Sequence, residues 1–209
     1  MRILVLSGFL GSGKTSLLMG LARFLAKDAD EKDPPRVIIL ENEAGVQGVD
    51  DTLLRSQGFQ VENLFAGCAC CTVGSELIQS ISYIEEKFAP DWLILETTGL
   101  AYPGLIRDNL RAACQKTCRI CTVVDAQRFH RILKPMEALL QGQISCADVV
   151  LINKTDLATE EEIKLCETDI YRIQPETCCV RTCATTGQSD NVWKLVLGED
   201  NSQHKPDMQ

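Results

Sequence analysis

The sequence GFLGSGKT at residues 8–15 decides which fold this chain adopts. Its spacing is glycine, four residues, glycine, lysine and threonine, which is the pattern of a P-loop that holds phosphate. The apolar run Ile3–Ser7 comes directly before it, and the helical pattern Lys14–Lys27 follows it. In this strand–loop–helix context, the backbone N–H groups of the loop and the helix N-terminus face the phosphate oxygens. The stretch therefore predicts a nucleotide-binding domain.

This loop provides the first candidate site residues. The motif places Lys14 against the β- and γ-phosphates and offers the Thr15 hydroxyl to Mg²⁺. Its glycines allow the backbone to curl closely around the phosphates. The candidates for phosphate binding are Gly8, Gly11, Ser12, Gly13, Lys14, Thr15 and Ser16.

The remainder of the chain alternates short apolar runs with helical patterns. Continuously apolar strands that alternate with helices are typical of a parallel sheet covered on both faces. We therefore expect an α/β fold of the P-loop NTPase type, with a mostly parallel sheet and helices on both faces. The predicted strands are Ile3–Ser7, Val37–Leu40, Trp92–Leu95, Ile120–Val124, Val149–Ile152 and Cys178–Thr182. The predicted helices are Lys14–Lys27, Ser75–Lys87, Pro103–Cys114, Pro135–Cys146, Glu160–Arg172 and Val192–Leu197.

Two further segments complete the predicted organisation. Thr52–Leu54 and Val61–Phe65 flank Ser56-Gln57-Gly58, and this arrangement predicts a β-hairpin. The polar residues 198–209 predict a flexible C-terminal tail. No internal repeat or linker divides the rest of the chain, so we expect one domain over residues 1–197.

A second nucleotide motif, Asn153-Lys154-Thr155-Asp156, directly follows a predicted strand. A carboxylate at Asp156 can accept two hydrogen bonds from N1 and N2 of guanine, which adenine does not offer, so such a site rejects the wrong base strongly. After the last predicted strand, backbone N–H groups of Cys183 and Ala184 could also hold the base, with an ordinary turn as the alternative. We expect GTP and GDP as ligands, and the base-site candidates are Asn153, Lys154, Asp156, Cys183 and Ala184.

The sequence Glu96-Thr97-Thr98-Gly99 ends the predicted strand Trp92–Leu95. A carboxylate at this strand end can orient Mg²⁺ or a water bound to it. Gly99 lets the backbone approach the γ-phosphate, although a capping acid in a turn is the alternative interpretation. We expect Glu96 to take part in catalysis and magnesium binding, and Gly99 to contact the nucleotide.

The charge and hydropathy of the chain exclude several classes of partner. The net charge is −8, whereas binding to nucleic acid or to an anionic membrane requires a basic face. No apolar run reaches the ~18 residues that a bilayer span needs. The apolar N-terminus continues into the P-loop without a cleavage site of small residues, which predicts a buried first strand instead of a signal peptide. We therefore expect a cytoplasmic protein.

Eleven cysteines are an unusual feature of the composition. In a reducing compartment most of them are better explained as small core residues than as disulfide partners. The segment GCACCTVG, residues 67–74, differs because it sets Cys68, Cys70 and Cys71 within four residues. Thiolates are soft ligands that suit Zn²⁺, Cu⁺ and, with nitrogen or oxygen partners, Co²⁺ or Ni²⁺, of which Zn²⁺ and Co²⁺ are the expected metals. Cys68 and Cys70 form the expected pair, with Cys71 as a further candidate; packed or redox-active thiols are the alternative.

These motifs together resemble the CobW/HypB/UreG family of P-loop metallochaperone GTPases, and the CobW branch in particular. The resemblance extends from residue 1 to about residue 190, and it rests on the order and spacing of GFLGSGKTSLL, ENEAGVQGVD, GCACCTVG, ETTGLAYPG, VVDA and NKTDL. Members of the family usually carry a second, C-terminal domain and often a histidine-rich stretch. This chain has only His130 and His204, so it resembles the CobW-like GTPase domain without that second domain.

The resemblance implies slow GTP hydrolysis, a nucleotide-dependent homodimer, and delivery of a transition metal to a client metalloprotein or cofactor-assembly protein. It also implies that residues 42–50 form a switch loop that senses the nucleotide. Asp50 is then a candidate for binding Mg²⁺ or orienting the attacking water. Glu43, a water or a cysteine of a second subunit could complete a tetrahedral site with the thiols. The catalytic candidates are Lys14, Asp50 and Glu96, and the metal candidates are Thr15, Glu43, Asp50, Glu96, Cys68, Cys70 and Cys71.

One hypothesis explains why a nucleotide site and a thiol cluster occur together. GTP and Mg²⁺ would order the switch loop and the thiol loop, and hydrolysis would relax both and release the metal. A tenfold change in affinity needs only ~1.4 kcal/mol of coupling. Two alternatives stay open: a GTP-dependent metal or redox sensor that regulates a partner without transferring metal, and a P-loop kinase or ATPase with a structural metal.

Overall fold

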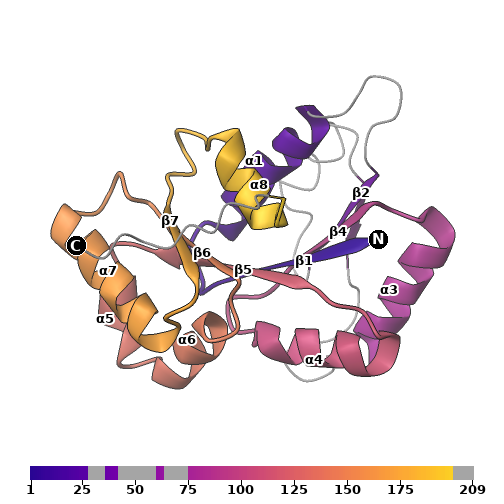
Figure 1. Ribbon diagram of the computed structural model, residues 1–209, viewed down its shortest axis with the longest axis horizontal. Coiled ribbons are helices and arrows are strands. Elements are labelled where there is room, and N and C mark those ends of the chain that lie inside the picture. Colours follow the sequence, from indigo (N-terminus) through magenta and orange to yellow (C-terminus); the bar gives the residue numbers. More distant parts are fainter. Residues whose placement is uncertain (28–35, 42–59, 64–74, 200–209) are drawn as a thin grey trace.

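A computed structural model describes residues 1–27, 36–41, 60–63 and 75–199. Its centre is a seven-stranded sheet of parallel strands in the order β3-β2-β4-β1-β5-β6-β7 (Figure 1). The strands are β1 (Arg2–Ser7), β2 (Val37–Glu41), β3 (Gln60–Asn63), β4 (Trp92–Glu96), β5 (Arg119–Asp125), β6 (Val149–Asn153) and β7 (Cys178–Arg181). Because β1 lies between β4 and β5, the loop that follows it emerges where the strand order reverses, which is where open α/β sheets bind ligands.

Helices cover both faces of this sheet. They are α1 (Lys14–Lys27), α3 (Ser75–Phe88), α4 (Pro103–Cys114), α5 (Phe129–Leu133), α6 (Glu137–Ile144), α7 (Glu160–Ile173) and α8 (Asp190–Leu197). In Figure 1, α1 and α8 lie on one face, and the remaining labelled helices lie on the other. The chain therefore has three layers with two separate cores.

The central strand β1 shows why the strands have continuously apolar sequences. Leu4 and Leu6 pack in the core beneath α1 and α8, whereas Ile3 and Val5 pack in the opposite core. Successive side chains of a strand point to opposite faces of its sheet. A strand covered on both sides consequently buries an apolar side chain at every position.

The predicted α/β class and the six predicted strands are confirmed, with small shifts of their boundaries. The strand β3 differs from the prediction, because it pairs in parallel with β2 at the edge of the sheet. The sequence predicts this segment as one arm of a hairpin, and the other predicted arm, Thr52–Leu54, lies outside the described residues. A short strand's sequence shows that it is extended, but its pairing partner depends on distant parts of the chain.

Two helices also differ from the sequence prediction. The helix α5 (Phe129–Leu133) was not predicted, because five residues are too few to display a helical period. The predicted helix Pro135–Cys146 is shorter in the structure, where α6 spans Glu137–Ile144. Its predicted first residues instead belong to a turn that follows α5.

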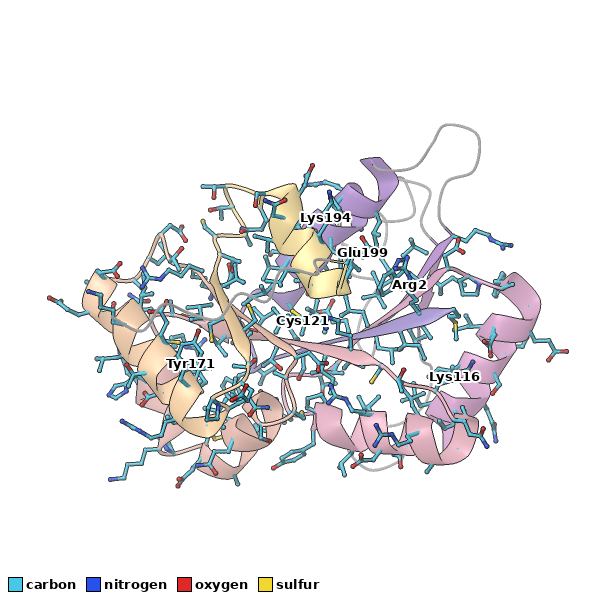
Figure 2. The ribbon with its side chains drawn as sticks, in the orientation of Figure 1. Arg2, Lys116, Cys121, Tyr171, Lys194 and Glu199 are labelled. Atoms are coloured by element: carbon cyan, nitrogen blue, oxygen red, sulfur yellow. The ribbon has the colours of Figure 1, made fainter. Side chains whose placement is uncertain are left out.

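The described cysteines are all free thiols, and two of them are completely buried. Cys121 lies in β5 within the interior of the molecule (Figure 2), and Cys166 lies in α7. Burial raises the pKa of Cys121 to about 12, so its thiol stays protonated at neutral pH. In the described ranges, no group of three or more cysteine, histidine or acidic residues could hold a metal ion. The expectation that the cysteines are small core residues is therefore confirmed for Cys121 and Cys166, whereas the other described cysteines are partly exposed.

The two ends of the described chain are joined by one ion pair. Nη1 of Arg2, at the start of β1, lies 2.8 Å from Oε1 of Glu199, which follows α8 (Figure 2). The same guanidinium lies 4.1 Å above the centre of the Trp92 ring.

Among the described helices, none is both long and apolar enough for a bilayer crossing.

Candidate nucleotide site

The P-loop curls tightly between β1 and α1, and two of its glycines permit this path. Gly8 has φ of +137° and Gly13 has φ of +97°, a conformation that residues with a Cβ rarely adopt. A Cβ at Gly8 would lie 2.1 Å from the carbonyl oxygen of Val123. A Cβ at Gly13 would lie 2.3 Å from Nδ2 of Asn153. The loop therefore has both its curvature and its close neighbours only if these positions are glycine.

Lys14 and Ser12 are the buried polar side chains of this loop. The Lys14 side chain folds back so that Nζ donates to the carbonyl oxygens of Gly8 and Phe9 at 3.0 and 3.5 Å. Ser12 is 1% exposed, and its hydroxyl has no hydrogen-bond partner among the described residues. Since buried polar groups are normally hydrogen-bonded, the Ser12 hydroxyl is available to a ligand. Ser16 lies exposed in the first turn of α1.

Thr15 and Glu96 bring two oxygen ligands together beside the P-loop. The Thr15 hydroxyl donates to Oε1 of Glu96 over 2.8 Å. Glu96 ends β4, which pairs directly with β1, so the sheet register sets this distance. Hydroxyl and carboxylate oxygens are the hard ligands that Mg²⁺ prefers. These two residues therefore fit a magnesium ion.

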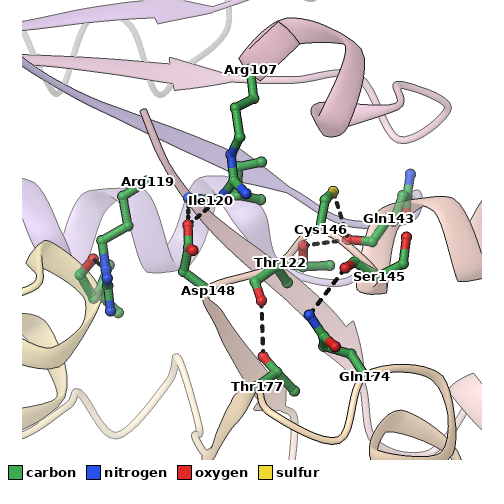
Figure 3. A network of polar contacts seen from close by, with 12 residues as sticks. Arg107, Arg119, Ile120, Thr122, Gln143, Ser145, Cys146, Asp148, Gln174 and Thr177 are labelled. Carbon is green, nitrogen blue, oxygen red and sulfur yellow. Dashed lines mark hydrogen bonds and ion pairs between the residues drawn. The ribbon is translucent and has the colours of Figure 1, made fainter. Parts of the chain in front are cut away.

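The segment after β4 lies directly against the P-loop. A Cβ at Gly99 would lie 2.5 Å from the backbone nitrogen of Leu10, so only glycine allows this approach. Gln143 of α6 holds the segment from behind, because its Nε2 donates to the carbonyl oxygens of Gly99 and Ala101 at 3.1 and 3.0 Å. The Gln143 carbonyl accepts a hydrogen bond from the hydroxyl of Thr122 at 2.9 Å (Figure 3). Gln143 was not a sequence candidate, since no motif marks a buried glutamine.

Asn153 docks the second motif onto the P-loop. Its Nδ2 donates to the carbonyl oxygen of Ser12 at 2.9 Å, and its Oδ1 accepts from the backbone nitrogen of Ala184 at 3.0 Å. The side chain is 1% exposed. One buried amide thus connects the P-loop, the end of β6 and the loop after β7.

Lys154 makes a second link to the same loop. It has φ of +62°, and its Nζ donates to the carbonyl oxygen of Gly11 at 2.6 Å and to Oδ2 of Asp125 at 2.7 Å. The other oxygen of Asp125 accepts from the backbone nitrogens of Gln127 and Arg128, each at 3.1 Å. Asp125 was missed as a site residue, although it ends β5 in register with Asn153, and a carboxylate at a strand end was the available signal.

Cys183 stands close to the acidic residue of the base motif. Hydrogen bonds with the side chains of Thr185 and Thr186 lower the pKa of Cys183, and a hydrogen bond with the Asp156 side chain opposes them. The Sγ of Cys183 lies 2.9 Å from Oγ1 of Thr185. The backbone nitrogen of neighbouring Ala184 already donates to Asn153. The structure thus brings Asp156, Cys183 and Ala184 together at one end of the site.

Five of the sequence candidates lie outside the described residues. They are Glu43 and Asp50 of the expected switch loop and the thiols Cys68, Cys70 and Cys71. The other candidates all lie around the carboxyl ends of β1, β4, β6 and β7.

A P-loop after the central strand of a parallel sheet, with a second motif docked on it from β6, defines the class of P-loop nucleoside triphosphatases. Within this class the chain belongs to the CobW/HypB/UreG family. Residues 2–181 match the sequence pattern of that family, which is described as "CobW/HypB/UreG, nucleotide-binding domain". The resemblance stated from the motifs is therefore confirmed.

Curated relatives extend beyond the length of this chain. The chain is 32% identical to the zinc-regulated GTPase metalloprotein activator 1 of Schizosaccharomyces pombe, over 97% of this chain and 51% of the relative. It is 31% identical to the zinc chaperone YjiA of Escherichia coli, over 77% of this chain and 51% of the relative. The chain thus spans about half the length of these relatives.

Solved structures share the fold. The Zn(II)-bound YjiA GTPase from E. coli has a TM-score of 0.66 at 23% identity, with 95% of this chain and 62% of that chain covered. HypB from Helicobacter pylori in complex with nickel has a TM-score of 0.65 at 19% identity, with 95% and 85% covered. At these identities the likeness shows the fold.

Proposed function

We propose that this chain is the GTP-hydrolysing domain of a metallochaperone that binds a transition metal under the control of GTP and delivers it to a client metalloprotein or cofactor-assembly protein. One observation carries the nucleotide part of this proposal. Asn153 and Lys154 donate to the P-loop carbonyl oxygens of Ser12 and Gly11 at 2.9 and 2.6 Å, which joins the phosphate and base halves of one site. The metal part is supported by relatives that are named zinc-regulated GTPase metalloprotein activator and zinc chaperone.

The proposed reaction is attack of water on the γ-phosphate of GTP. Lys14 neutralises charge on the β- and γ-phosphates, and Thr15 and Glu96 hold Mg²⁺ through oxygens that lie 2.8 Å apart. When bound, Mg²⁺ supplies further charge neutralisation at the phosphates. Asp50 of the expected switch loop is proposed to orient the attacking water. Asp156 is proposed to select guanine through two accepted hydrogen bonds.

The proposed cargo is Zn²⁺ or Co²⁺, held by Cys68 and Cys70 with Cys71 and Glu43 as further ligands. GTP binding would order the switch loop and the thiol loop together, and hydrolysis would relax both. By reciprocity, the metal must then tighten the binding of GTP by the same factor.

An apolar surface beside the γ-phosphate segment supports a protein partner. Leu10, Leu100, Tyr102 and Leu105 are each more than 40% exposed, at 47%, 49%, 43% and 56%. Exposed apolar groups of this kind mark interaction sites when they lie together, and Leu10 contacts the segment that contains Gly99. We propose that this surface takes part in a nucleotide-dependent homodimer. We also propose a cytoplasmic role; the net charge of −8 supports the absence of nucleic acid and anionic membrane partners, which require a basic face.

We also propose residues 1–197 as one domain, followed by the tail over residues 198–209 that the polar sequence predicts to be flexible; within it, residues 200–209 lie outside the described residues, and Glu199 pairs with Arg2. The helix α8 ends at Leu197, and Gly198 follows it in the left-handed conformation that commonly ends a helix. Val196 and Leu197 pack in the same core as α1.

Competition binding tests the nucleotide part. GTP and ATP compete for the purified chain against fluorescent N-methylanthraniloyl-GDP in the presence of Mg²⁺. GTP should bind at least about a hundredfold more tightly, because adenine leaves Asp156 without its hydrogen bonds. Equal affinities would favour a P-loop kinase or ATPase instead.

A zinc titration tests the metal part. The reduced chain is titrated with Zn²⁺ in Mg²⁺-GTP and in Mg²⁺-GDP, and the titration is repeated with Cys68→Ser and Cys70→Ser. Cys114→Ser is the matched control, since Cys114 is a free, partly exposed thiol in α4. Tighter binding with GTP that both loop variants abolish supports the proposal. Transfer of zinc to an apo-client then separates delivery from a sensor, which binds a partner without losing metal.

A further inference from the structure

Arg128 lies beside the P-loop, although no sequence motif marks it. It is the exposed residue that precedes α5, after the end of β5. Its Nη1 lies 3.3 Å from the position that a Cβ would take on Gly11. The guanidinium therefore lies against the P-loop, the segment that its motif assigns to phosphate.

The backbone of Arg128 is firmly held. Its nitrogen donates to both the carbonyl oxygen and Oδ1 of Asp125, each at 3.1 Å. The next residue, Phe129, is 1% exposed and anchors α5 in the core. Asp125 also binds Lys154, which donates to Gly11. One carboxylate thus sets the positions of two cations along the same side of the P-loop.

The guanidinium of Arg128 has no hydrogen bond or ion pair within the part of the chain that the structure describes. Neighbouring arginines differ: Arg131 lies 2.8 Å from Glu162, and Arg172 lies 3.2 Å from Asp169. In a chain with a net charge of −8, acidic partners are plentiful. An arginine that lacks one and points at an anion-binding loop is available to phosphate, which its planar fork matches in geometry.

The surroundings of the loop indicate which phosphates Arg128 can reach. Gly99, from the segment expected at the γ-phosphate, lies against Leu10. Arg128 lies against the next residue, Gly11, which also accepts from Lys154 of the base motif. Arg128 therefore approaches from the side of the base, where the α- and β-phosphates lie.

We propose that Arg128 is a nucleotide-binding residue whose guanidinium pairs with the α- and β-phosphates of the bound nucleotide. This assignment rests on the proposed guanine-nucleotide site. Because GDP and GTP share these two phosphates, Arg128 strengthens the binding of both by the same factor. It adds nothing to the recognition of guanosine, which has no phosphate.

The test measures the Kd of the full chain for N-methylanthraniloyl-GDP and N-methylanthraniloyl-GTP, with competition by guanosine. The variants are Arg128→Gln and Arg128→Lys, and Arg131→Gln is the matched control from α5, the helix that Arg128 precedes. Arg128→Gln should raise both Kd values about tenfold or more, as expected for loss of hydrogen bonds to a charged group. Its ratio of GTP to GDP affinity and its guanosine competition should stay unchanged. The Kd values of Arg128→Lys should lie between those of the unaltered chain and of Arg128→Gln. The Kd values of Arg131→Gln should equal those of the unaltered chain.

Three outcomes would overturn the assignment. Unchanged Kd values for Arg128→Gln would overturn it. The proposed function would still stand, because the unaltered chain binds guanine nucleotides in the same experiment. A loss confined to the GTP derivative would place the contact on the γ-phosphate instead. A structural role would be shown by two results together. The nucleotide-free Arg128→Gln chain melts at a lower temperature than the unaltered chain, and Arg128→Lys binds fully only below that lower melting temperature. If the unaltered chain binds no guanine nucleotide, the proposed function fails first.

Discussion

The hydroxyl of Thr15 donates to Oε1 of Glu96 over 2.8 Å, which joins the first turn of α1 to the end of β4. The motif around Thr15 and the turn around Glu96 are separated by about eighty residues in the sequence. Their contact follows from the parallel pairing of β1 with β4, in which Leu6 is aligned with Glu96. The sheet therefore assembles the oxygen ligands that we assign to Mg²⁺.

Glu96→Gln should slow GTP hydrolysis by about a hundredfold, a typical loss when one electrostatic group at the reacting phosphate is removed. The amide keeps the shape of the side chain but loses its negative charge, so the variant should require more Mg²⁺ for half-maximal rate. Phosphate release under single-turnover conditions at several Mg²⁺ concentrations measures both effects. Glu85→Gln, at a partly exposed position of α3 that pairs with Lys116, is the matched control. If Glu96→Gln hydrolyses GTP at an unaltered rate, Glu96 only caps the turn and takes no part in catalysis.

Asn153→Ala should destabilise the nucleotide-free chain by about 3 kcal/mol, because it leaves the buried Ser12 carbonyl and the partly buried Ala184 N–H without their partners. Urea unfolding followed by circular dichroism measures this change in the free energy of unfolding. Asn191→Ala, at an exposed position of α8, should change it by less than about 0.5 kcal/mol. Equal effects of the two substitutions would contradict the bridging role of Asn153.

Asp156→Asn should exchange the preferred base. An asparagine amide presents a donor where the carboxylate accepts, so it mismatches guanine N1 and N2 and matches the O2 acceptor of xanthine. We expect the affinity for GTP to fall at least about a hundredfold and that for xanthosine triphosphate to rise. Competition against the fluorescent GDP derivative measures both. Parallel loss of both nucleotides would point to misfolding of the loop, which the circular dichroism spectrum would reveal.

Gln143→Met should weaken GTP binding more than GDP binding. The substitution removes the two hydrogen bonds that hold Gly99 and Ala101 against the P-loop while it keeps the volume of the side chain. We expect the ratio of GTP to GDP affinity to fall about tenfold. Gln141→Met, on the exposed face of the same helix, is the control. An unchanged ratio would show that the segment needs no support from α6.

Cys183 should be the fastest of the described cysteines to react with iodoacetamide. Hydrogen bonds from Thr185 and Thr186 lower its pKa, so a larger fraction is thiolate at neutral pH, whereas burial raises the pKa values of Cys121 and Cys179 to about 12. Its labelling rate should level off at a lower pH than the rates of the buried thiols. Mass spectrometry of labelled peptides at pH 6 to 9 measures each site. GDP should protect Cys183 but not Cys114, since only Cys183 adjoins Asp156.

Local sequence patterns predicted those parts of the site that depend on neighbouring residues. The glycine spacing from Gly8 to Thr15 defines its own loop, because φ/ψ restrictions and helix initiation act within a few residues. Asn153 to Asp156 could be assigned for the same reason, as a short motif at a strand end. Asp125 carried the signal of a carboxylate at a strand end, but it was not assigned because the segment around it matches neither the P-loop motif nor the base motif.

The sequence by itself determined the α/β class, the P-loop and the order of the strands along the chain, because these follow from hydrophobic period and from backbone restrictions between close neighbours. Only the tertiary structure decided that β3 pairs with β2, that Gln143 supports Gly99, and that Asp125 holds Lys154 and Arg128 beside Gly11. These relationships join residues that are far apart in the chain. They exist because strand pairing and helix packing bring distant polar groups within hydrogen-bond distance, and no local pattern encodes which groups will meet.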